Sequence, residues 1–252
     1  MPLAIVQTAL DPPSLEQLQR AFAAVPSLTR FDAHFAARDA FGVLIDNLAD
    51  DDARRLHRAL AAEGVDTRVV DQDQLPKLPP HKTTKRMDCL GDRLVIYDAL
   101  GRARPIEWPQ VVLIAAGSVT LTEQKRTETV RFHRYGNDLP VTVTEIDYKD
   151  VQQDRLVLEL IVRGDPPRYR AVAHGFLYNY LGPRRRQQAA ENFRLLLADL
   201  VGLAKGAALN RGAAGLVRQP PQFFHYPTRH AFEEELSWLL WRMVGLAGLD
   251  AP

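Results

Sequence analysis

The most concentrated polar cluster in the chain is Arg184-Arg185-Arg186, which stands directly before an amphipathic segment. Three adjacent guanidinium groups near the free N–H groups of a helix N-terminus are typical of a site for phosphate or another anion. Lys125 and Arg126, in a polar segment earlier in the chain, would join them. One hypothesis is therefore an anionic ligand or membrane surface held by these residues. The alternative is a solvated run that pairs with nearby acidic side chains.

Aromatic residues form a second candidate site near the end of the chain, where a last helix is expected after Thr228. The members of this group are Phe223, Phe224, Tyr226, Trp238 and Trp241. If they were exposed, they would form a contact surface for a partner. If the segment folds back over the rest of the protein, each ring would bury about 150–250 Å². We favour the second interpretation and keep the first as the partner-binding hypothesis.

Sequence motifs for catalysis are missing. The chain contains no phosphate-binding glycine loop, no G-x-S-x-G, no H-E-x-x-H and no pair of cysteines. His225 and His230 lack a third ligand at metal spacing. We therefore expect no catalytic residue, no metal and no cofactor. The enzymatic alternative is a dispersed site near the 121–150 segment, built from His133, Tyr135, Asp138 and His174.

Composition narrows the class of protein. The 252 residues include 32 basic and 31 acidic side chains, a net charge of +1, which disfavours a dedicated nucleic-acid binder. Cys89 is the only cysteine, so the chain cannot form an internal disulfide. The N-terminus lacks the charged and apolar regions of a signal peptide, and Leu236–Leu249 is too short to cross a bilayer. We expect a cytoplasmic protein.

Residues 3–71 carry local signals for alternating strands and helices. Ser14 with Gln17, and Thr29 with Asp32, mark two helix starts. The acidic run 50–52 suits the first turn of a third helix, because acidic groups there offset the helix dipole. Short apolar runs lie between these segments. The expected order is strand, helix, helix, strand, helix, strand.

That order, which ends in LIDNLADDDARRLHRALAAEGVDTRVV, resembles the C-terminal domain of the bacterial ribosomal stalk protein. It also resembles the related fold of the adaptor that feeds substrates to the Clp protease. The resemblance covers residues 3–71, about a quarter of the chain. It rests on the pattern of elements and on no functional motif, so it implies a bacterial protein with this fold and no particular binding residue.

After a proline-rich linker, the pattern changes to strands. Residues 92–117 read as a strand, a turn at Gly101, a strand, a corner at Trp108 and a third strand. Trp108 is expected to pack at this corner. The polar residues 121–150 are expected to form an enlarged loop or an added hairpin, with a turn at 136–138 and a strand over 141–146. A further strand is predicted over 156–162.

The stretches RLVIYDALGRARPIEWPQVVLIAAG and ENFRLLLADLVGLA, taken together, resemble the pleckstrin-homology superfold, including its bacterial and GRAM-type members. The resemblance covers residues 82–205 and implies a bent antiparallel sheet closed by one helix. The long 121–150 segment departs from it, which puts any inherited mode of ligand binding in doubt. Both resembled folds serve mainly as recognition modules.

Together these observations predict an α+β protein with four segments. They are a small α/β domain over 1–74, a linker over 75–81, a pleckstrin-homology-like domain over 82–205, and a tail with an amphipathic helix over 206–252. We expect a non-enzymatic role in protein interaction or as a scaffold, with a second copy or another protein as the partner. An anionic ligand is the alternative, and a nucleic acid is not expected.

Overall fold

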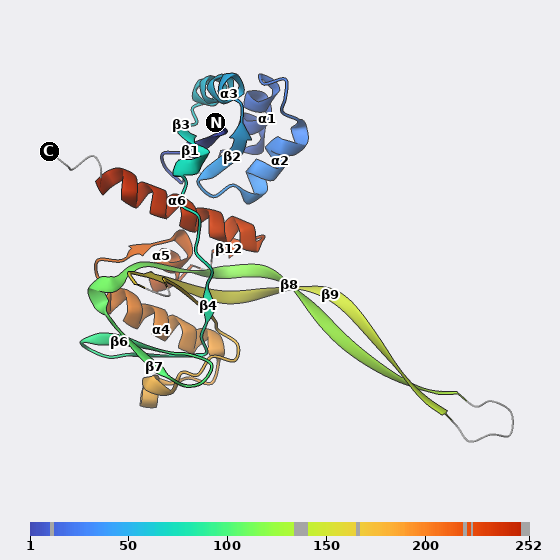
Figure 1. The fold of residues 1–252 in the computed structure, drawn as a ribbon, viewed down its shortest axis with the longest axis vertical. Helices are drawn as coiled ribbons and strands as arrows, with labels where there is room; N and C mark the ends of the chain where they lie inside the picture. The colour runs from blue at the N-terminus through green and yellow to red at the C-terminus, as the bar shows by residue number, and fades with distance from the viewer. Residues whose placement is uncertain (11–12, 134–140, 165–166, 219–220, 223, 248–252) are drawn as a thin grey trace.

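The computed structural model describes all residues except 11–12, 134–140, 165–166, 219–220, 223 and 248–252. Helices and three separate β-sheets make up the chain (Figure 1), which confirms the predicted α+β class. Two of the sheets belong to a central body, and the third forms a separate N-terminal layer.

The N-terminal layer has the predicted order of elements. They are β1 (Leu3–Gln7), α1 (Leu15–Ala23), α2 (Arg30–Asp39), β2 (Val43–Leu48), α3 (Asp50–Ala62) and β3 (Thr67–Asp71). β1 lies in the middle of the sheet, antiparallel to both β2 and β3. The capping boxes at Ser14 and Thr29 form as expected, so local hydrogen bonds set where α1 and α2 begin.

A short 3₁₀ turn and the proline-rich stretch lead into the body. Its first elements are η1 (Gln72–Gln74), β4 (Lys82–Thr83), β5 (Arg86–Cys89), β6 (Arg93–Tyr97), β7 (Ala103–Glu107) and η2 (Trp108–Gln110). Strands β5, β6 and β7 form an antiparallel sheet. Trp108 is buried at the corner after β7, and its indole N–H donates to the Leu90 carbonyl at 3.1 Å. The predicted packing role of Trp108 is confirmed.

Two very long strands dominate the second sheet of the body: β8 (Val111–His133) and β9 (Val141–Val162). They pair with each other along their whole length. The third strand predicted within 92–117 and the strand predicted over 141–146 are therefore parts of continuous strands, and 121–150 extends the hairpin. The predicted turn at 136–138 lies outside the described residues. Both faces of a two-stranded ribbon meet water, so the apolar alternation that marks a strand is weak there.

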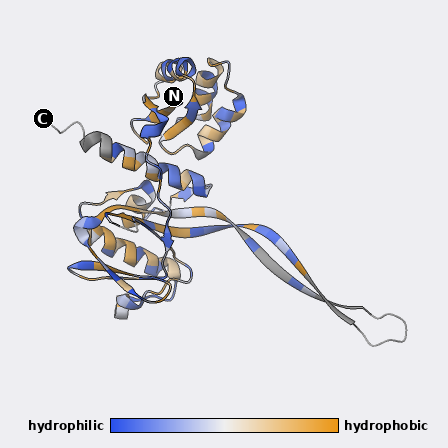
Figure 2. Ribbon diagram, viewed as in Figure 1, coloured by the Kyte–Doolittle hydropathy of each residue, from blue (hydrophilic) through white to orange (hydrophobic). Residues whose placement is uncertain are grey.

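Shorter elements complete the body. They are β10 (Arg168–Val172), η3 (Asn179–Arg184), α4 (Ala189–Leu203), β11 (Ala208–Leu209), α5 (Arg211–Val217) and β12 (His225–Tyr226). The order of the sheet is β11-β8-β9-β10-β4, with β12 also on β8. Helix α4 is mostly apolar (Figure 2) and buries Phe193, Leu196, Leu197 and Leu200 in the main core, as its spacing predicts. Gly212 lets α5 approach β8, because a Cβ there would lie 1.8 Å from the Ala116 carbonyl oxygen.

The last helix, α6 (Arg229–Ala247), lies between the N-terminal layer and the body (Figure 1). Phe232 and Leu236 pack with core residues of β8. Trp238 belongs instead to a cluster with buried residues of β1, β2 and β3. The helix is therefore apolar on more than one side, which agrees with its position between two packed units.

Candidate functional site

A two-stranded arm is the most prominent surface feature of the protein (Figure 1). We define the arm as residues 120–133 of β8 and 141–154 of β9, which form fourteen antiparallel pairs. At about 3.3 Å per residue, this part of the ribbon is about 45 Å long. Within the described part of the chain, no third strand pairs with it. A two-stranded ribbon is only marginally stable in water by itself, so a free arm of this length is suited to contact another molecule.

One edge of the arm continues an edge that the protein already uses. The Ser118 N–H donates to the Phe224 carbonyl at 2.9 Å, on the side of β8 that β12 occupies. In an antiparallel pair, the backbone groups of alternate residues point away from the partner strand. The same alternation turns the backbone groups of Thr122 and Gln124 outward, beyond the end of β12. This edge can therefore receive another extended segment.

Two large apolar side chains lie exposed on one face of the arm. Ile146 is 46% exposed and Tyr148 is 59% exposed. Since they are two residues apart on β9, they point to the same face of the ribbon. Glu128 lies opposite Ile146 in the register. An apolar pair with a charged residue beside it is a suitable contact for a protein surface.

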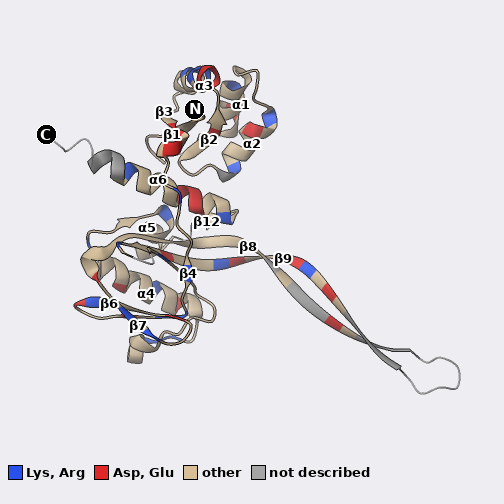
Figure 3. Ribbon diagram, viewed as in Figure 1, with Lys and Arg blue, Asp and Glu red and all other residues tan. Residues whose placement is uncertain are grey.

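The charge of the arm is mixed. Its 28 positions carry four basic and six acidic side chains, a net charge of −2. Figure 3 shows both signs interspersed along the ribbon. A surface that binds a nucleic-acid backbone carries an excess of Lys and Arg, because these neutralise phosphates. The arm therefore fits a protein partner better than a nucleic acid.

The base of the arm is held firmly by the body. Thr120 donates to Asp154 at 2.6 Å across the first pair of the arm. Below it, the buried Tyr226 donates from its hydroxyl to Glu235 of α6 at 2.5 Å and accepts from Asn210 at 2.8 Å. Burial and the nearby Glu235 carboxylate raise the pKa of Tyr226, so this phenol stays neutral. The direction in which the arm leaves the body is therefore fixed.

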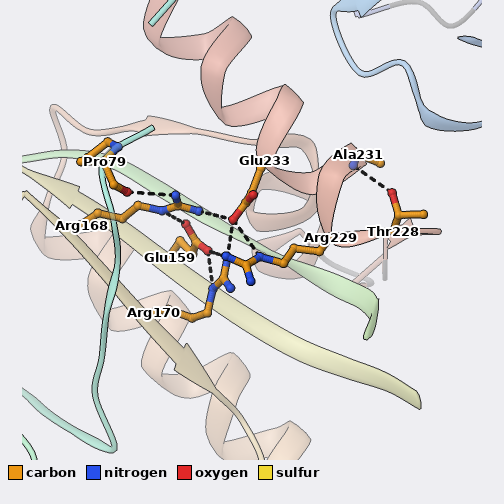
Figure 4. Close-up of polar contacts among 8 residues, drawn as sticks. All are labelled: Pro79, Glu159, Arg168, Arg170, Thr228, Arg229, Ala231 and Glu233. Atoms are coloured by element: carbon orange, nitrogen blue, oxygen red, sulfur yellow. Dashed lines mark hydrogen bonds and ion pairs between the residues drawn. The ribbon is translucent and has the colours of Figure 1, made fainter. Parts of the chain in front are cut away.

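A buried cluster of charges fastens α6 to the same sheet (Figure 4). Arg168 donates to Glu159 at 2.5 Å and to Glu233 of α6 at 2.7 Å. Arg170 also binds both carboxylates, with 2.8 Å to Glu233. Arg229 adds a third guanidinium at 3.0 Å from Glu233. Glu159 is fully buried, and a buried carboxylate requires such partners.

Glu233 lies at the partly exposed end of this cluster, and the neighbouring arginines control the protonation of its carboxyl group. Burial by itself would raise the pKa of the Glu233 carboxyl, but hydrogen bonds from Arg168 and Arg229 outweigh it and lower the pKa to about 2. Burial and the neighbouring Arg170 lower the pKa of His81, so the imidazole adds no charge at neutral pH. Arginine contacts occupy both oxygens of Glu159 and one oxygen of Glu233, so the cluster is a structural contact between α6 and the sheet.

The predicted anion site is not assembled as one unit. Arg184 is paired with Asp199 through two hydrogen bonds of 2.9 and 2.7 Å, and α4 begins only at Ala189. Arg185 and Arg186 are exposed. Lys125 and Arg126 lie in the arm, opposite Lys149 and Tyr148 in the register. Figure 1 shows the arm leading away from α4, so the structure does not bring the two groups together.

The aromatic group behaves largely as the fold-back interpretation predicts. Tyr226 and Trp238 are 0% and 2% exposed, so they are not available to a partner, and their assignment to an exposed partner site is wrong. Phe224 and Trp241 are partly buried against the same clusters. Phe223 lies outside the described residues. Tyr226 and Trp238 are buried because α6 fills the space between the two packed units.

The dispersed catalytic site is contradicted where it can be checked. His133 pairs with Val141, whereas β10, which ends two residues before His174, pairs with Val157. The sixteen positions from Val141 to Val157 correspond to about 50 Å along β9. His133 and His174 therefore cannot act together. Tyr135 and Asp138 lie outside the described residues.

The described residues also offer little support for a nucleophilic cysteine or a metal site. Burial raises the pKa of the Cys89 thiol to about 12, so the thiolate needed for nucleophilic attack is scarce. Within the described residues, no three His, Cys, Asp or Glu side chains are placed to hold a metal ion. None of the helices described combines the length and the apolar character that a membrane crossing requires.

Sequence reasoning missed both the arm contacts and the charge cluster. A signal for the cluster was present: Arg168 and Arg170 alternate with Tyr169 and Ala171 in a strand, where one face must be buried. For the arm, Ile146 and Tyr148 alternate with charged residues in a segment that lacks glycine and proline. That pattern favours a strand over a loop.

Comparisons with known proteins returned no relatives. No family model matches the chain, and neither the curated proteins nor the solved structures contain a match. The resemblances to the ribosomal stalk, Clp adaptor and pleckstrin-homology folds stay predictions. The functional argument therefore rests on the geometry of the arm and its base.

Proposed function

We propose that this chain is a non-enzymatic protein-interaction component that contacts its partner through the arm. The observation that carries the proposal is the run of fourteen strand pairs that no third strand joins in the described part of the chain, with Ile146 and Tyr148 exposed on one face. Two large apolar groups exposed in the middle of a free ribbon would be removed from water by a partner. Burial of such groups is the main source of binding free energy.

The two parts of the arm supply different components of recognition. Outward backbone groups at Thr122 and Gln124 offer main-chain hydrogen bonds to an extended segment of the partner. The Ile146 and Tyr148 side chains then select the partner by shape and apolar character. The partner we infer is a protein with an extended segment next to an apolar patch. The net charge of −2 on the arm favours a segment with a small basic excess.

The test is an affinity capture in the native cell with the full chain as bait. The double variant Ile146→Asp/Tyr148→Asp changes the apolar face, and Thr129→Asp/Lys149→Asp places a comparable change on the opposite face, where both residues are exposed. We expect the wild type and the Thr129/Lys149 variant to capture the same partner protein. The Ile146/Tyr148 variant should not capture it. With the purified partner, the loss in affinity should be about 100-fold.

The outcomes separate the proposal from its competitors. Equal retention by both double variants would show that the apolar face takes no part in binding. Loss of the partner with both variants, at unchanged thermal stability, would mean that both faces of the arm contact the partner, and it would contradict selection by the Ile146/Tyr148 face. Retention that disappears after nuclease treatment would point to a nucleic acid.

A further inference from the structure

A cavity of about 460 Å³ lies on the body, well away from the arm, where the β5-β6-β7 sheet meets the β4 edge of the larger sheet. Its floor is formed by buried side chains: Ile96 of β6, Tyr169 of β10, and Thr84. Its rim is formed by β4 and by the turn that joins β6 to β7. The volume lies in the range of sites for small organic ligands.

The floor is stiff because Thr84 links the two sheets. Its N–H donates to the Arg170 carbonyl at 2.9 Å, and its hydroxyl lies 2.8 Å from the Tyr97 carbonyl oxygen. The first bond belongs to the larger sheet and the second to the smaller one. A site held by backbone contacts of this kind is formed before any ligand arrives, which reduces the entropy lost on binding.

The rim turn is also fixed in place. Asp98 accepts hydrogen bonds from the backbone N–H groups of Leu100 and Arg102, both at 2.9 Å, and from the Arg102 guanidinium at 2.6 Å. The backbone and side-chain hydrogen bonds from Arg102 lower the pKa of the Asp98 carboxyl. The single carboxylate of the lining is therefore fully used by the turn and by Arg102.

The other two cations of the lining keep their charge available. Lys82 and Arg104 line the cavity, and neither forms an ion pair with any residue in the described ranges. Since Asp98 balances Arg102, the cavity has a net positive charge from these two side chains. Leu100, which is 77% exposed, gives the mouth an apolar side. A large exposed leucine beside unpaired cations suits a ligand that has both an apolar group and a negative charge.

We propose that this cavity binds a small organic anion that carries an apolar group. Lys82 and Arg104 hold its carboxylate or phosphate, and Ile96 and Leu100 contact its apolar part. The pairing of a mainly apolar, buried floor with two cations of the lining carries the proposal. This site is separate from the Arg184–Arg186 cluster, where Asp199 already neutralises one of the three arginines.

The experiment titrates the full chain with four probes: hexyl phosphate, hexanoate, hexan-1-ol and inorganic phosphate. Affinities come from calorimetry, and the location comes from shifts of the backbone amide signals of residues 96–104. We expect the two charged amphiphiles to shift these signals and to bind at least about tenfold more tightly than the alcohol or inorganic phosphate. The difference between hexyl phosphate and hexanoate identifies the preferred head group.

Variants connect the binding to the named residues. Lys82→Gln/Arg104→Gln should weaken binding of the preferred amphiphile by about 100-fold, because two charge-assisted contacts are lost. The matched control is Lys85→Gln/Arg163→Gln, which removes two exposed cations that do not line the cavity. Leu100→Ser should weaken both amphiphiles and leave inorganic phosphate unchanged. Thermal unfolding checks that all variants fold.

Any one of the following results would overturn the proposal. The first is equal affinity for hexan-1-ol and hexyl phosphate, which would remove the role of charge. The second is equal affinity for inorganic phosphate and hexyl phosphate, which would remove the apolar contact. The third is unchanged affinity in Lys82→Gln/Arg104→Gln, or no binding of either charged amphiphile.

Discussion

The indole N–H of Trp238 donates a hydrogen bond of 2.7 Å to the carbonyl oxygen of Gln7, across 231 positions of the chain. The ring of Trp238 lies directly against Gly42, which has a φ of +103° and whose added Cβ would be 2.3 Å from the ring. Helix α6 thus inserts one side chain into the N-terminal layer while Glu233 binds the body. The position of the layer relative to the arm depends on this helix.

Trp238→Ala should uncouple the N-terminal layer from the body. Truncating a buried tryptophan costs about 3–5 kcal/mol. Because the lost contacts join two packed units, we expect calorimetry to resolve two unfolding transitions in place of one, with the lower one from the N-terminal layer. Trp238→Phe keeps most of the packing and loses the hydrogen bond to Gln7, so it should cost about 1 kcal/mol. An unchanged single transition in Trp238→Ala would contradict this coupling.

Gly42→Ala should have a larger effect than Gly64→Ala. Both glycines have a positive φ, +103° and +76°, so alanine strains the backbone at both positions. Only at Gly42 would the new Cβ also collide with Trp238, since nothing lies within 4 Å of a Cβ at Gly64. We expect Gly64→Ala to cost about 1 kcal/mol and Gly42→Ala to cost more than twice as much in urea unfolding. Equal costs would mean that α6 does not press against β2.

Glu233→Gln should make the stability of the protein less sensitive to acid. The arginine contacts lower the Glu233 pKa from its ordinary value of 4.5 to about 2, which corresponds to about 3 kcal/mol. A lowered pKa in the folded state gives stability that is complete above pH 4.5 and is lost as the pH falls towards 2. The difference in unfolding free energy between wild type and variant should therefore shrink from pH 5 to pH 2.

The control for this measurement is Asp50→Asn, which breaks an exposed pair with Arg54. Exposed ion pairs contribute less than about 1 kcal/mol, so this variant should follow the wild type at every pH. A Glu233 variant whose deficit stays constant down to pH 2 would show that Glu233 acts by packing and not by its charge.

Cys89 should react slowly with thiol reagents in the folded protein. Burial raises its pKa to about 12, so the thiolate is rare at pH 8. An unfolded chain has a cysteine pKa near 8.5, and the folded protein should therefore react at least about 100-fold more slowly. Labelling with a disulfide reagent, with and without urea, measures the ratio. Similar rates in both conditions would show that the thiol is accessible and ionised.

The features that could be predicted from the sequence are those set by neighbouring residues. The capping boxes at Ser14 and Thr29 act over three residues, and they correctly located α1 and α2. Trp108 was predicted to pack at a corner between two strands because the strand pattern changes beside it. By contrast, the contact of Trp238 with Gln7 spans most of the chain, and no local pattern indicates its partner.

The candidate site was hidden for a related reason. A strand in a covered sheet shows its apolar face in the sequence, but the arm has no covering layer, so its weak pattern left an enlarged loop and an added hairpin as alternatives. The structure shows the hairpin. Arg168 and Arg170 lie in a buried strand, where their charges are stable because Glu159 and Glu233 lie beside them. Both partners come from other elements, so their role follows from the fold and not from spacing.

Shortening the arm should leave the rest of the protein intact. In β8, even-numbered residues such as Ser118 bond away from β9, so Glu123 and Val151 form a hydrogen-bonded pair. A two-residue Asn-Gly turn fits such a pair, so replacing residues 124–150 with Asn-Gly closes a short hairpin. The removed part includes Ile146 and Tyr148, which are exposed and add little to the core. We expect the melting temperature to stay within about 2 °C of the wild type, while the partner retained by the full chain is lost. A large fall in melting temperature would mean that the arm stabilises the body and does not serve a partner.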